Sequence, residues 1–206
     1  MRIHRTSLGL GGVLALAAAL SACAGGHGSS AAAPGGTRGT SSTRSATPAA
    51  TETNPAGDIP DSQVYVPFRY AGLFTVKVPE GWARRRDGSA TVFTDKLNTV
   101  RVQRRQAAKA PTRASASAEL PHIRAAVHGF KPGSVTRVRR GGGPAVRITY
   151  RAESAPNPVT GKRVPDAVER YEYWKGGTEA VLTLSGPVGA DNVDPWKTIS
   201  DSLRWR

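Results

Sequence analysis

The chain of 206 residues contains one cysteine and one methionine, and aromatic residues make up 6% of it. Its only cysteine, Cys23, cannot form a disulfide within the chain, so a disulfide-stapled scaffold is excluded. Acidic residues are also scarce, with 15 Asp and Glu against 29 Lys and Arg. No G-x-S-x-G sequence is present, and no thiol follows Cys23. Two common signatures of a hydrolase nucleophile, the G-x-S-x-G motif and a cysteine thiol, are therefore absent from the chain after Cys23.

A general acid and base are equally hard to find. The chain after residue 62 has two histidines, His122 and His128, which do not have the i, i+4 spacing of a helical metal pair. Glu169 and Glu172 would face opposite sides of one strand, because their separation is an odd number of residues. We therefore expect no catalytic residues, no metal and no cofactor, and we keep a hydrolase as the weaker alternative.

The amino terminus has the three-part order of a secretory signal peptide: basic Arg2 and Arg5, an uncharged run over residues 8–20, and the small residues Ser21 and Ala22. The run is shorter than the roughly 20 residues that a membrane-spanning helix needs. Leu20-Ser21-Ala22-Cys23 resembles the lipobox of bacterial lipoproteins. The resemblance implies a signal peptide over residues 1–22, cleavage between Ala22 and Cys23, and a diacylglycerol and palmitate anchor on Cys23. The alternative is an ordinary secreted protein with a stray cysteine.

Composition divides the remainder into two parts. Residues 23–62 are rich in Gly, Ala, Ser, Thr and Pro, which predicts a disordered tether behind the lipidated Cys23. Such a tether reaches roughly 35 Å on average, and its Ser, Thr and Pro would suit O-glycosylation. Residues 63–206 hold all four tryptophans and are long enough for one globular domain. We expect the domain to lie on the extracytoplasmic face of a bacterial cell membrane.

Charge gives the domain a candidate role. Residues 63–206 carry 25 Lys and Arg against 12 Asp and Glu, a net charge of +13. Such a surface attracts anionic lipid, cell-wall polymer or an acidic envelope protein. The same arginine excess would also follow from a high-GC coding bias, and both readings stay open. Nucleic acid is not expected as a partner, because an exported, anchored protein does not meet it.

Apolar patterning predicts an α+β domain. We expect strands at residues 73–78, 90–94, 98–104, 134–140, 145–152, 168–175 and 180–185, where apolar residues alternate with polar ones. Leu120, Ile123, Val127 and Phe130 predict a helix that begins shortly before Pro121 and ends before Gly129. Asp194 as N-cap and Pro195 as first residue predict a second helix. The result is an antiparallel β-sheet of about six to seven strands with two main helices packed on it.

Three segments resemble a known family. Phe74 to Trp82, Gly189 to Trp196 and Ser202 to Trp205 are similar to segments of the actinobacterial LpqN lipoprotein family, which is similar to the Mog1/PsbP-like fold. The resemblance covers roughly residues 65–206. It implies an antiparallel sheet flanked by helices, used as a non-enzymatic binding or adaptor module, and it carries no catalytic residues to this chain. The basic surface departs from the family.

Two sets of residues are candidate contacts for a ligand. Arginines beside predicted turns could converge on one anion: Arg84, Arg85, Arg86, Arg139 and Arg140. They could equally be solvated turn residues. Alternatively, Tyr171, Tyr173, Trp174 and Trp82 could line a cavity for a small apolar ligand, which would make the domain a carrier.

Overall fold

The computed structural model describes residues 56–157 and 159–206. The predicted signal peptide, the lipid site at Cys23 and most of the predicted tether lie outside these residues. Among the residues that are described, no helix is long and apolar enough to cross a membrane.

The described part contains ten strands and two helices. Two sheets form, a three-stranded one with the order β1-β2-β10 and a seven-stranded one with the order β3-β4-β5-β9-β8-β7-β6, and every pairing is antiparallel. In chain order the elements are β1 (Tyr65–Tyr70), β2 (Phe74–Pro79), β3 (Ala83–Asp87), β4 (Ala90–Asp95), β5 (Asn98–Gln106), α1 (Arg113–Ala126), β6 (Lys131–Arg140), β7 (Gly143–Glu153), β8 (Pro165–Lys175), β9 (Thr178–Pro187), α2 (Val193–Asp201) and β10 (Arg204–Trp205).

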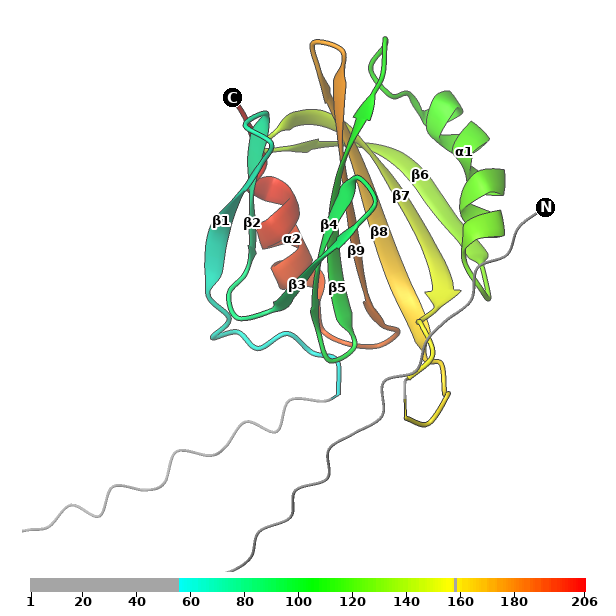
Figure 1. Cartoon of the computed structure of the whole chain (residues 1–206). Coiled ribbons are helices and arrows are strands. Elements are labelled where there is room, and N and C mark those ends of the chain that lie inside the picture. The colour runs from blue at the N-terminus through cyan, green and yellow to red at the C-terminus, as the bar shows by residue number, and fades with distance from the viewer. Residues whose placement is uncertain (1–55, 158) are drawn as a thin grey trace, which may run out of the picture. The chain divides into compact units, whose positions relative to one another are not determined.

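The elements form three layers around the seven-stranded sheet (Figure 1). On one face, the small sheet and α2 enclose the main core, which includes Phe74, Leu184, Tyr173 and Ile199, all fully buried. On the other face, α1 covers β6, β7 and β8 through a smaller cluster around Ala116 and Ile148. The helix leaves the α1 side of β3, β4, β5 and β9 uncovered, and this opening shapes the larger site below.

Helix α1 starts earlier than the sequence predicts. Thr112 is its N-cap and forms a capping box with Ser115, so the first turn is closed eight residues before Pro121. Pro121 therefore lies inside the helix, where it removes one hydrogen bond. The helix persists because Glu119 is bound to Arg105 of β5 and Arg170 of β8, which holds its middle on the sheet.

Helix α2 also begins before its predicted start. Its N-cap is Asn192 rather than Asp194, and Pro195 lies within the first turn, where its missing N–H is harmless. The Asn192 side chain makes no cap bond. It bonds instead to the amide of Ile59, the carbonyl of Gly57 and the side chain of Asn98. We call this buried set the amide latch: Gly57, Ile59, Asn98 and Asn192.

Because of the amide latch, the packed domain begins earlier in the chain than the sequence predicts. Ile59 is buried in the main core, although it falls in the segment predicted as tether. Asn98 donates a hydrogen bond to the carbonyl of Gly57 at 2.8 Å. The backbone amide of Asp191 donates to the side-chain carboxylate of Asp58. The packed structure therefore includes residues 57–62, before the predicted boundary at residue 63.

The predicted α+β architecture is observed, and the predicted strands are present with ends extended by a few residues. Three short strands are additional. β1 pairs with β2, β3 pairs with β4, and β10 adds two residues to the small sheet. The expected single sheet is thus divided into two, because β1 and β2 fold over the main core instead of extending it.

Candidate functional site

The structure places the five candidate arginines in two groups at opposite edges of the large sheet. Arg84, Arg85 and Arg86 lie in edge strand β3, whereas Arg139 and Arg140 end edge strand β6. Six inter-strand steps separate these edges, which corresponds to about 29 Å at the usual strand spacing of ~4.8 Å. One small anion cannot contact both groups.

The β3 group is dispersed around its strand. The guanidinium of Arg84 stacks on the ring of Phe68 at 4.8 Å from the centroid. Arg85 faces the other side of the sheet, with Asp87 at 4.0 Å, and Arg86 is exposed. Asp87 is itself held by Arg101, whose hydrogen bond and charge lower the pKa of the carboxyl. These three side chains therefore do not point at one acceptor.

Arg140 lies in a pocket that the sequence did not reveal. A cavity of about 220 Å³ lies between α2 and the β7–β8 side of the sheet, and Arg140, Arg147, Lys197, Glu169 and Tyr171 are among its lining residues. We call it the basic pocket. Arg139, by contrast, is exposed and does not line it.

The two arginines of the basic pocket have unused donors. The Nε atoms of Arg140 and Arg147 are both buried, and neither has a hydrogen-bond partner in the described part of the chain. Arg140 Nε lies 3.5 Å from Asp201, and Arg147 donates through Nη1 to Glu169 at 3.3 Å. Glu169 also accepts a 2.5 Å bond from the Tyr171 hydroxyl. The buried Nε–H groups remain available to a bound oxyanion.

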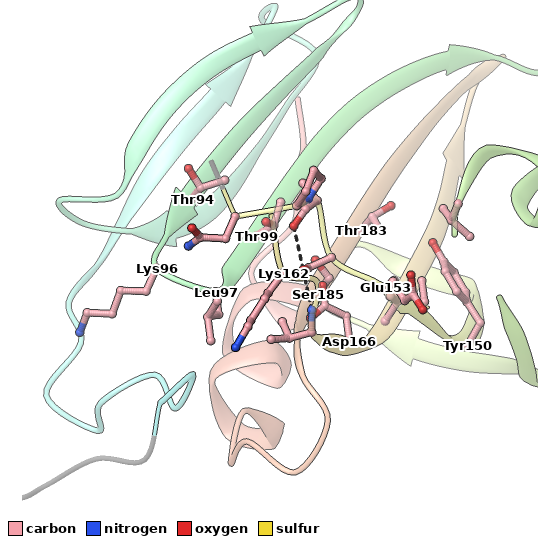
Figure 2. Close-up of a pocket in the computed structure, with 18 of the residues that line it drawn as sticks. Thr94, Lys96, Leu97, Thr99, Tyr150, Glu153, Lys162, Asp166, Thr183 and Ser185 are labelled. Atoms are coloured by element: carbon pink, nitrogen blue, oxygen red, sulfur yellow. Dashed lines mark hydrogen bonds between the residues drawn. The ribbon is translucent and has the colours of Figure 1, made fainter. Parts of the chain in front are cut away.

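A larger hollow than the basic pocket lies on the other face of the large sheet (Figure 2). It has a volume of about 610 Å³, within the range of small-molecule sites. Its floor comes from β5, β8 and β9, and its walls come from the β4–β5 turn and the segment between β7 and β8. We call it the hydroxyl groove, because Thr94, Thr99, Thr183 and Ser185 line it together.

Strand register explains the hydroxyl groove. Thr94 pairs with Thr99, Thr99 with Ser185, and Ser185 with Val168, which pairs with Tyr150. These residues therefore form one row across five strands, on the face that α1 leaves open. At ~4.8 Å per strand the row is about 19 Å long. No hydrogen bond among the described residues uses the hydroxyls of Thr99, Thr183 or Ser185.

Asp166 lines the hydroxyl groove (Figure 2) and is its most unusual residue. Asp166 is only 7% exposed to solvent. Its Oδ1 atom is buried and has no hydrogen-bond partner among the described residues. Burial raises the pKa of this carboxyl from 3.8 to about 6. Burial is the cause of this shift, and no ion pair joins Asp166 to a cation among the described residues.

A separate ionic cluster joins α1 to the sheet. Arg105 contacts three carboxylates, Glu119 at 2.9 Å, Glu172 at 3.3 Å and Glu179 at 2.9 Å, and Arg170 completes it. Burial raises the pKa of Glu172 despite its arginine partners. Burial also opposes ionisation of Glu119, but the hydrogen bonds and charge of Arg105 outweigh it and lower the pKa of Glu119. None of these glutamates lines the basic pocket or the hydroxyl groove, so the cluster is a structural joint.

Glu169 and Glu172 do lie on opposite faces of β8, as the odd separation predicts. Glu169 accepts from Tyr171 on the main-core side, and Glu172 belongs to the ionic cluster on the α1 side. Within residues 56–157 and 159–206, no group of three or more His, Cys, Asp and Glu is arranged to hold a metal ion.

The four aromatic residues expected to line an apolar cavity do not share one. Tyr171 and Tyr173 stack in the filled main core, 6.2 Å apart. Trp174 donates to the carbonyl of Ala107 at 2.7 Å, and Trp82 donates to Gln63 at 3.3 Å. A carrier for an apolar ligand therefore finds no support in these residues.

Sequence reasoning missed the residues that matter most in both hollows: Arg147, Lys197 and Asp166. Alternation alone would place Arg147 on a solvated strand face, with nothing to distinguish it from Arg101, Arg137 and Arg151. In the structure Arg147 and Arg151 face the α2 side, and Arg101 and Arg137 face the α1 side. Asp166 gives no distinctive signal, because it is one of three acids in β8, with Glu169 and Glu172.

Comparisons with known proteins agree with the fold. No protein-family model matches the sequence, and a search of curated proteins finds no match. Among solved structures, the cyanobacterial PsbP of Synechocystis superposes with a TM-score of 0.50 at 12% identity, covering 74% of this chain and all of that one. Likeness at this identity shows the fold alone, and the expected PsbP-like α+β fold is confirmed by it.

Two other solved structures resemble this chain with TM-scores below 0.5. The Ran-binding protein Mog1p of Saccharomyces cerevisiae has a TM-score of 0.46 at 10% identity, over 70% of this chain and 96% of that one. LpqN of Mycobacterium tuberculosis, described as involved in cell envelope biogenesis, has a TM-score of 0.42 at 15% identity, over 69% of this chain and 91% of that one.

Proposed function

We propose that this protein is an extracytoplasmic lipoprotein that presents a non-enzymatic binding or adaptor domain at the bacterial cell envelope. The amino-terminal pattern supports export and a lipid on Cys23. The basic pocket supports a ligand that carries an oxyanion, such as an anionic lipid headgroup, a wall polymer or an acidic face of an envelope protein. An envelope hydrolase is the weaker candidate: Glu153 and Asp166 both line the hydroxyl groove, but no histidine of the described residues lines either hollow to activate a serine or threonine nucleophile.

The observation that carries the proposal is the pair of buried Nε–H groups on Arg140 and Arg147. A buried hydrogen-bond donor without a partner lowers the stability of the protein by roughly 1–3 kcal/mol. Two such donors in one cavity therefore favour the binding of a hydrogen-bond acceptor. Lys197 adds a third positive charge to the same cavity, whereas two carboxylates, Glu169 beside Arg147 and Asp201 beside Arg140, oppose the three cations. Among oxyanions, phosphate suits such a site best, because its several oxygens can accept from converging arginines.

Co-sedimentation with lipid vesicles tests the anion site. Residues 50–206 contain both hydrophobic clusters and every described element, so this fragment can be studied without the lipid. We expect it to bind vesicles that contain phosphatidylglycerol, to ignore phosphatidylcholine vesicles, and to dissociate in high salt. The variant R147M/K197M should lose most of the binding.

The control removes the same charge elsewhere. K109M/K175M changes two exposed lysines that line neither the basic pocket nor the hydroxyl groove. If both double variants weaken binding equally, only the overall charge matters and the pocket has no special role. If the unmodified fragment binds no anionic vesicle, the ligand is not a lipid, and wall polymer or an acidic protein becomes the partner to test.

The anchor needs its own experiment. In cells fed radiolabelled palmitate, the full chain should take up label and partition with the membrane, whereas C23S should do neither. An unlabelled full chain that is released into the medium would support the alternative of an ordinary secreted protein. Because two acyl chains are needed for stable anchoring, a soluble C23S protein is the expected matched control.

A further inference from the structure

The hydroxyl groove has features that the proposed function does not use. It opens on the α1 face of the large sheet, whereas the basic pocket lies on the α2 face, so the two hollows are separated by the sheet itself. A ligand in one does not contact the other. Any activity of the groove is therefore independent of the anion site.

The lining of the groove is unusual for a sheet surface. Hydroxyl side chains from three adjacent strands, β4, β5 and β9, stand next to one another in register. A hydroxyl both donates and accepts a hydrogen bond, so this row presents alternating donors and acceptors along its length. At the far end of the row, Tyr150 adds an aromatic ring with a hydroxyl.

The carboxyl of Asp166 points to the class of ligand. A carboxyl on a residue that is more than nine-tenths buried is costly unless a donor reaches it, and the described residues supply none to Oδ1. A ligand that brings a donor into the groove would satisfy this oxygen. Sugar hydroxyls meet this need, because they donate to carboxylates and exchange hydrogen bonds with Ser and Thr in both directions.

We propose that the hydroxyl groove is a saccharide-binding site, in which Asp166, Thr99, Thr183 and Ser185 hydrogen-bond to the hydroxyls of an extended oligosaccharide. The row length of about 19 Å favours several sugar units over one ring. Lys96 and Lys162 are exposed residues of the lining, and they favour a saccharide that carries acidic groups.

Nuclear magnetic resonance titration of residues 50–206 tests the site, with a hyaluronan hexasaccharide as the acidic probe and maltohexaose as the neutral one. We expect the backbone amides of Thr99, Thr183 and Ser185 to shift with at least one probe, and more with the acidic one. Shifts confined to the basic pocket, or no shifts with either probe, would overturn the proposal.

Variants separate hydrogen bonding from general charge. T99V/T183V replaces two hydroxyls by methyl groups of the same shape and should weaken saccharide binding at least about tenfold, as expected for two lost hydrogen bonds. D166A should also weaken it, without loss of folded structure, because the carboxyl has no hydrogen-bond partner among the described residues. T75V is the matched control, since Thr75 lies in β2 of the small sheet. Unchanged affinity in T99V/T183V would also overturn the proposal.

Discussion

Replacing Asp166 by asparagine should make the protein more stable at neutral pH and leave it almost unchanged in acid. The folded-state pKa of Asp166 is raised to about 6 from an ordinary value of 3.8, because burial disfavours the charged form. The native state therefore holds its proton where the unfolded chain has already released it. Stability linked to this group is fully present below pH 3.8, falls as the pH rises toward 6, and stays low above that.

The size of the effect follows from the same two values. The difference between the two pKa values corresponds to about 3 kcal/mol in the free energy of unfolding. About 2.4 kcal/mol of this is lost as the pH rises from 4 to 7.5. Asparagine does not titrate, so the stability of D166N relative to the native sequence should rise by about 2–3 kcal/mol over this range. Both proteins contain the same other titrating groups, so the contributions of those groups to the pH dependence cancel in the difference.

Urea denaturation of both proteins at pH 4 and pH 7.5, followed by circular dichroism, measures this change. The informative quantity is the change in the difference with pH, because a buried amide can shift both values by a constant amount. A difference that is the same at both pH values would refute the argument and would mean that Asp166 is solvated or paired. A larger advantage of D166N in acid than at neutral pH would contradict the sign.

Three further substitutions test the fold. N192A removes the centre of the amide latch and should lower the free energy of unfolding by about 2–3 kcal/mol, with faster hydrogen exchange at Ile59 as its local signature. T112A breaks the capping box of α1 and should cost about 1 kcal/mol in urea denaturation, whereas loss of all helical signal would show that the cap nucleates the fold. G141A should be far more damaging, because its methyl group would overlap the carbonyl of Asp201, and a normal melting temperature would show that this loop can move away.

The strand pattern was readable from the sequence because one face of each long strand is buried. In β7, Val146, Ile148 and Tyr150 alternate with arginine and threonine. An apolar residue at every second position predicts both the strand and the face that it buries. Strand β3 gave no such signal, since all five of its residues are exposed. Its position depends on pairing with β4, which a local pattern does not contain.

The two hollows could not be predicted for a different reason. Each depends on register between strands that are far apart in the sequence, such as Thr99 with Ser185 or Arg147 with Tyr171. The start of α1 is also predicted wrongly from local propensity, because a proline such as Pro121 usually marks the first turn of a helix. Here ion pairs from β5 and β8 to Glu119 hold the helix together around the proline. Tertiary contacts decide such positions.

The amide latch has a mechanical consequence. Residues 57–59 are tied to Asn98 of β5 and to Asn192 at the start of α2, and Asn192 and Pro187 also line the basic pocket. Tension applied to the chain from its amino-terminal side would reach these few hydrogen bonds before it reached the ladder of either sheet. A pull strong enough to open the latch would disturb the rim of the basic pocket first, so ligand release there would precede unfolding of the domain.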